Sequence, residues 1–184
     1  MLNGLTLDKR NNTSVNWRSI LKALTAADGY LTGCDINFTS NTITVGDGYL
    51  IACGTVVQNE GAETIDATPS VSSGFARLKL VVDLTQEASA SDPAQTYWAV
   101  DYSATEPLPA LTQEDITGSG SIYEMEVAVF TVSGGNLTAI SKQMKKAGIN
   151  ADSENYVTNI VITTTEPSLE TQTANPTVLY MVVE

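Results

Sequence analysis

Acidic residues form the close pairs in this sequence that could perform acid–base chemistry. The 184-residue chain contains no histidine, which removes the most common general base and the Ser-His and Cys-His pairs of hydrolases. Glu124 and Glu126 are two positions apart, and Glu114 and Asp115 are adjacent. A carboxylate-dependent glycosidase needs two such groups. Because no aromatic-rich cleft accompanies either pair, we interpret both as solvated carboxylates and expect no catalytic residue, no metal ion and no cofactor.

Three aromatic residues gather in one short segment, and they are the candidate sugar-stacking residues: Tyr97, Trp98 and Tyr102. Aromatic faces pack well on pyranose rings, so this segment could bind a carbohydrate. If the segment is a strand, Trp98 and Tyr102 share one face with Val100, which favours packing in a core. Both interpretations stay open at this point.

A candidate interface is an amphipathic helix predicted over residues 14–27. The polar stretch before it ends in good N-cap residues, and Asp28-Gly29 ends the pattern. Four apolar residues recur between them at helical spacing: Trp17, Ile20, Leu21 and Leu24. This stripe must be buried against something. Either it caps the β core of its own chain, or it faces the same helix in sister subunits.

Alternating apolar and polar residues predict strands over most of the remaining chain. The segments are 34–39, 42–45, 49–57, 75–84, 96–102, 123–132 and 137–140. Hairpin turns are expected at Ser40-Asn41 and at Gly46-Asp47-Gly48, which would join the first three strands into a meander. In 123–132 we expect Glu124 and Glu126 on one face, and the other face to carry Tyr123, Met125, Val127 and Val129.

These elements predict a mainly β protein. We expect an antiparallel β-sandwich or barrel-like meander with one N-terminal amphipathic helix and a small C-terminal strand pair. The expected divisions are an N-terminal arm and helix (1–30), a β core domain (31–141), a linker (142–155) and a small C-terminal β-hairpin module (156–184).

Composition limits the partners and the location. Nine basic and 21 acidic residues give a formal net charge of −12, which repels nucleic acid and anionic membranes. The first ten residues lack the pattern of a signal peptide, and no apolar run is long enough to cross a bilayer. We therefore expect synthesis in a cytoplasm without export, and free thiols at Cys34 and Cys53.

Several segments follow one another in a distinctive order. The predicted helix leads into Asp28–Asp35 and then Ile43–Gly54, with glycines around a short apolar strand. The same layout continues through Phe75–Leu84, Pro109–Ile116 and Ile122–Phe130. Over about residues 14–140 this layout resembles tail or baseplate proteins of phages and prophages of Gram-positive bacteria, in particular the N-terminal modules of tail fibres and receptor-binding proteins. The resemblance is one of architecture, so it implies no functional residue.

This resemblance implies a non-enzymatic β-rich assembly or attachment module of the virion. Such a module assembles symmetrically, with a trimer favoured, binds other tail or baseplate proteins, and is built into the particle in the host cytoplasm. Three alternatives stay open: a carbohydrate-binding or adhesin-like β module, a carboxylate-dependent glycosidase, and a barrel that holds a small ligand.

Overall fold

The computed structural model of the chain describes residues 13–87, 94–148, 159–163 and 178–182. The chain divides into two compact units, Met1–Asn150 and Ala151–Glu184. This division falls within 142–155, but the first part of that expected linker is not a linker: residues 142 and 143 belong to a strand, and the Ala147 N–H donates to the Tyr30 carbonyl. The expected N-terminal arm up to residue 12 and the second half of that linker lie outside the described residues.

The first unit is mainly β, as the sequence predicted. Its described residues form one helix and ten strands: α1 (Ser14–Leu24), β1 (Gly29–Gly33), β2 (Ile36–Thr39), β3 (Thr42–Val45), β4 (Gly48–Ala52), β5 (Thr55–Asn59), β6 (Glu63–Asp66), β7 (Ser73–Asp83), β8 (Thr96–Ser103), β9 (Ile122–Ser133) and β10 (Asn136–Gln143). The helix begins where predicted and ends three residues earlier. Strands β1 and β6 are additions to the predicted set.

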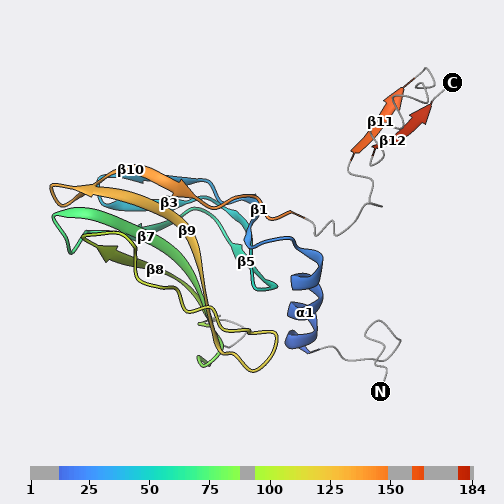
Figure 1. Cartoon of the computed structure of the whole chain (residues 1–184), viewed down its shortest axis with the longest axis horizontal. Helices are drawn as coiled ribbons and strands as arrows, with labels where there is room; N and C mark the ends of the chain where they lie inside the picture. Colours follow the sequence, from blue (N-terminus) through green and yellow to red (C-terminus); the bar gives the residue numbers. More distant parts are fainter. Residues whose placement is uncertain (1–12, 88–93, 149–158, 164–177, 183–184) are drawn as a thin grey trace. The chain divides into compact units, whose positions relative to one another are not determined.

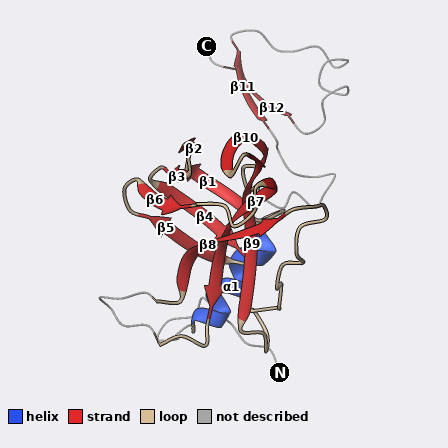
Figure 2. Cartoon of the chain, turned by 90° about the vertical axis from the view of Figure 1, so that its left-hand side faces the viewer, coloured by secondary structure: helices blue, strands red, loops and turns tan. Residues whose placement is uncertain are grey.

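The strands form three antiparallel sheets in a sandwich-like arrangement, ordered β1-β4-β5, β2-β3-β6 and β10-β9-β7-β8. In Figure 1, β7, β8 and β9 curve together as one layer, and α1 stands next to the end of β5. Figure 2 shows β5 and β6 beside β7 and β8. The architecture is thus a stack of small sheets with a single helix at one end.

A continuous apolar core lies between these sheets. Leu78 and Phe130 come from the four-stranded sheet, whereas Ile43 and Leu50 come from the two smaller ones, and all four are fully buried. The ring of Phe130 meets the edge of Phe38 with centroids 5.6 Å apart. Burial of large apolar side chains is the main stabilising contribution in such a core.

The expected three-strand meander is wrong at its second turn. Strands β2 and β3 pair across Ser40-Asn41, as predicted. Strand β3 then pairs with β6, and β4 pairs with β1, so Gly46-Asp47-Gly48 carries the chain from one sheet to another. Backbone hydrogen bonds hold this segment, from the Gly46 N–H to the Asp35 carbonyl and from the Cys34 N–H to the Asp47 carbonyl. These contacts replace the hairpin.

The predicted strand 49–57 is a hairpin of two strands, β4 and β5. Its turn is Cys53-Gly54, where both residues have positive φ, 45° and 77°. The Gly54 backbone lies so close to α1 that a Cβ there would be 2.0 Å from the Arg18 carbonyl oxygen. Only glycine fits this position without a shift of the helix. Cys34 and Cys53 are buried free thiols, as predicted.

Strand β9 contains an irregularity that changes which side chains face the core. Leu78 pairs with Ala128 but Lys79 pairs with Glu126, so Val127 is an extra residue on β9. Beyond this bulge the faces exchange. The expectation that Val129 shares the face of Met125 and Val127 is therefore wrong, and Phe130 takes the core position instead.

The second unit contains two described strands, β11 (Asn159–Thr163) and β12 (Val178–Val182). They pair with each other, as the expected strand pair requires, but the pairing is parallel. A hairpin joins antiparallel strands. The two described strands therefore form a parallel pair and not the expected β-hairpin.

Candidate functional site

Helix α1 is attached to the first unit through its polar side and its backbone. Thr13 caps the helix by accepting a hydrogen bond from the Asn16 N–H. Arg18 Nε donates to the Ile116 carbonyl at 3.0 Å, and Lys22 Nζ forms an ion pair with Asp115 Oδ1, also at 3.0 Å. Together with the close approach of Gly54, these contacts fix the helix without using its apolar stripe.

The apolar stripe of α1 remains largely uncovered within the described residues. Trp17 and Leu24 are 53% and 56% exposed, whereas Ile20 and Leu21 are half-buried. No residue of the helix is buried. The sequence left two partners open for this stripe, the core of the same chain or a sister helix. Trp17 and Leu24, at the two ends of the stripe, remain more than half exposed, so neither the core nor another described element covers them.

The carboxylate pair Glu124 and Glu126 lies in an ionic network on the face of the four-stranded sheet away from the core. Lys79 Nζ contacts Glu124 Oε1 at 2.6 Å and Asp101 Oδ1 at 3.0 Å. Arg77, whose side chain is 5% exposed, donates to Asp101 Oδ2 at 2.6 Å and lies 3.8 Å from Glu126 Oε2. Both glutamates thus neutralise cations of β7.

The second carboxylate pair holds the loop that leads into β9. Glu114 accepts hydrogen bonds from the backbone N–H groups of Ser121 and Ile122, which lower its pKa. Hydrogen bonds from Thr117 and Lys22 lower the pKa of Asp115 to about 2. A general acid at neutral pH needs a raised pKa. These two groups have the opposite shift, and their contacts are structural.

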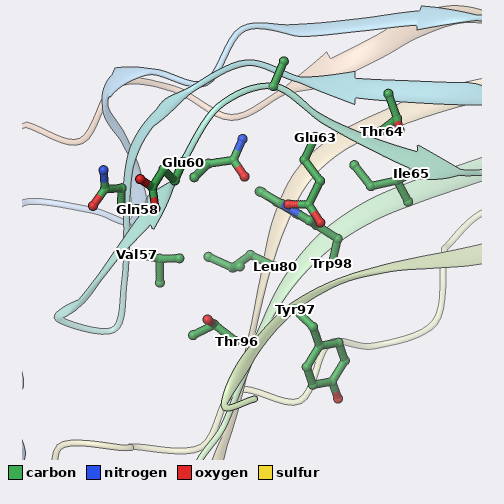
Figure 3. A pocket seen from close by; sticks show the side chains of 12 residues that line it. Val57, Gln58, Glu60, Glu63, Thr64, Ile65, Leu80, Thr96, Tyr97 and Trp98 are labelled. Atoms are coloured by element: carbon green, nitrogen blue, oxygen red, sulfur yellow. The ribbon is translucent and has the colours of Figure 1, made fainter. Parts of the chain in front are cut away.

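A cleft opens between β5–β6 and β7–β8, with a volume of about 550 Å³. Figure 3 shows Val57, Leu80 and Trp98 around this space. Trp98 Nε1 donates to Glu63 Oε2 at 2.8 Å, which links the two sheets across the cleft. The cleft combines aliphatic and aromatic walls with carboxylates at its border.

The structure does not gather the three sugar-stacking candidates on one surface. Trp98 and Tyr102 are partly buried and pack against the core, as the alternation allowed. Tyr97 also borders the cleft, but it is 46% exposed, and its ring points away from the middle of the cleft in Figure 3. The residues beside Trp98 that complete the cleft come from β5, β6 and their connection, which the sequence pattern did not single out.

The described residues contain no cluster of three or more His, Cys, Asp or Glu side chains that could hold a metal ion. No helix among them is long and apolar enough to cross a membrane. No protein-family model matches the chain, and no curated protein matches its sequence.

Proposed function

We propose that this chain is a non-enzymatic structural protein of a phage or prophage tail or baseplate, acting as an assembly or attachment module. The observation that supports it is the exposure of Trp17 and Leu24 on a helix that is already fixed to the β unit by other contacts. Covering a large apolar side chain contributes about 1.5–3 kcal/mol. A repeated contact between such helices therefore favours assembly.

In this proposal the partners are further copies of the chain, with a trimer favoured, and other tail or baseplate proteins. A symmetric oligomer repeats one contact in every subunit, so the two exposed apolar side chains of each chain are covered in every copy. The half-buried Ile20 and Leu21 lie between Trp17 and Leu24 and extend the same surface. The proposed location is the virion, assembled in the host cytoplasm.

The test is to purify virions of a phage whose genome encodes the chain and to identify their proteins by mass spectrometry. We expect the chain in particles from the native phage, and its loss from particles when the phage carries Trp17→Ser and Leu24→Ser together. Tyr97→Ser is the matched control, because Tyr97 is also an exposed aromatic residue but lies on β8. Absence of the chain from native virions would contradict the proposal.

The alternative is a carbohydrate-binding or adhesin-like module, and the cleft beside Trp98 is the observation in its favour. The separation of Tyr97 from Trp98 and Tyr102 weighs against a flat stacking platform. Saturable binding of a neutral sugar, lost when Trp98 is replaced by alanine, would support this alternative.

A further inference from the structure

The cleft beside Trp98 has an apolar interior and an acidic border. Val57, Ile65 and Leu80 supply aliphatic surface, and the carboxylates of Glu60 and Glu63 are exposed. Figure 3 shows the aliphatic side chains facing the space between β5 and β7, with both glutamates at its upper side. Such a cleft suits a ligand that has an alkyl part and a polar end.

Asn59 adds an acceptor that has no partner in the described part of the chain. This residue is only 6% exposed and borders both the cleft and a smaller cavity of about 290 Å³. Its Nδ2 donates to the carbonyls of Val45, Gly46 and Gly61 at 3.1, 2.8 and 3.0 Å. These bonds fix the amide orientation, and no described group donates to Oδ1. Asn59 Oδ1 is not among the fully buried unpartnered polar atoms of the described residues, so it keeps contact with solvent.

The charges of the lining decide which ligands fit. The lining contains two carboxylates and neither lysine nor arginine. The indole N–H of Trp98 is already bonded to Glu63. The cleft therefore presents mainly acceptors, and the net charge of −12 gives the chain a negative field. An anion is repelled, whereas an ammonium group donates three hydrogen bonds and is attracted to an aromatic ring.

We propose that this cleft binds the side chain of a lysine presented by a partner polypeptide. The alkyl stem lies along Val57 and Leu80, and the ammonium group bonds to the carboxylates of Glu60 and Glu63 and to Oδ1 of Asn59. None of the residues that line the cleft belongs to α1. Binding at this site goes beyond the proposed function, and either can fail without the other.

Titration of the full chain carrying Trp17→Phe tests the site. The sequence has two tryptophans, so this variant keeps Trp98 alone as the fluorescent indole. The probe is lysine blocked as Nα-acetyl and N-methylamide. We expect a saturable change in Trp98 fluorescence with an apparent Kd that rises with salt. The norleucine analogue, which lacks the ammonium group, and methyl glucoside are expected to give no saturable change.

Charge-removing variants locate the binding. Glu60→Gln and Glu63→Gln are each expected to raise the Kd about tenfold, the effect of losing one charge-assisted hydrogen bond. Glu106→Gln is the matched control, since it removes one exposed carboxylate that does not line the cleft. Equal weakening by all three variants, equal binding of norleucine, or binding of the glucoside in place of lysine would overturn the proposal.

Discussion

At the scale of single residues, Tyr123 and Asp28 show how a hydrogen bond joins distant segments. The Tyr123 hydroxyl donates to Asp28 Oδ2 at 2.6 Å, and Asp28 Oδ1 accepts from the Cys53 N–H at 2.8 Å. Burial raises the pKa of Tyr123, and the bond and charge of Asp28 raise it further. The hydroxyl therefore remains a donor throughout the neutral and mildly alkaline range.

Replacement of Tyr123 by phenylalanine is expected to lower the free energy of unfolding by about 2 kcal/mol, because Asp28 Oδ2 then loses the hydroxyl that donates to it. Chemical denaturation measures the change. Tyr97→Phe is the control, since Tyr97 is exposed and its hydroxyl has no partner among the described residues. Equal losses from the two variants would contradict the assigned role of the Tyr123 bond.

Asp101 links stability to pH through its two cations. Burial alone would raise its pKa, but the hydrogen bonds and charges of Arg77 and Lys79 outweigh burial and lower it. Since the folded-state pKa lies below the unfolded value of about 3.9, this stabilisation is present above that pH. It is lost as the pH falls through the folded-state pKa.

Asp101→Asn is expected to lower the free energy of unfolding at pH 7 by about 3 kcal/mol, because it leaves the buried Arg77 without its closest anion. The variant should also lose less stability than the native chain below about pH 4. Asp47→Asn, at an exposed aspartate outside the ionic network, should change stability by under about 0.5 kcal/mol. An unchanged acid profile in Asp101→Asn would contradict this account.

At the scale of elements, the turn between β4 and β5 determines how α1 sits. Gly54 and Gly61 both have positive φ, 77° and 83°. A Cβ on Gly54 would collide with the Arg18 carbonyl, whereas a Cβ on Gly61 would meet nothing within 4 Å. The two glycines therefore separate the effect of backbone conformation from the effect of helix contact.

Gly61→Ala is expected to cost about 1–2 kcal/mol, the conformational penalty alone. Gly54→Ala should cost more and should also speed hydrogen exchange of the α1 amides, because the helix must move away from the turn. Denaturation and exchange mass spectrometry measure the two effects. Unchanged α1 exchange in Gly54→Ala would show that the helix does not depend on this contact.

The elements also show how far sequence patterns reach. Alternation predicted β7, β8 and β9 because each is long and has one face in the core. It did not reveal the bulge at Val127, because Val127 and Ala128 fit either register. Glycine-rich turns look alike whether they close a hairpin or change sheets, and only the long-range bonds of Asp35 and Asp47 separate the two cases.

The cleft was beyond sequence reasoning for a similar reason. The aromatic segment pointed to Trp98, but its partner Glu63 lies 35 residues earlier on a short strand that was not predicted. The side-chain amide of buried Asn59 donates to three backbone carbonyls, and no local sequence pattern predicts that these carbonyls lie together. The α1 stripe, in contrast, was identified in full, because helical spacing is a local property.

At the scale of the whole molecule, we expect the protein to assemble with copies of itself. The described carboxylate pairs serve ion pairs and loop contacts, and α1 leaves Trp17 and Leu24 in solvent on a fixed helix. A chain with a net charge of −12 needs a specific contact to offset its self-repulsion. We expect that contact to be the α1 stripe.

The most direct test is the solution mass of the purified full chain, measured by light scattering over a concentration series. We expect a stable oligomer, with a trimer of three 19.5 kDa chains favoured, and its dissociation to monomers when Trp17→Ser and Leu24→Ser are combined. Tyr97→Ser should leave the oligomer intact. A native chain that stays monomeric at every concentration would contradict self-assembly through α1.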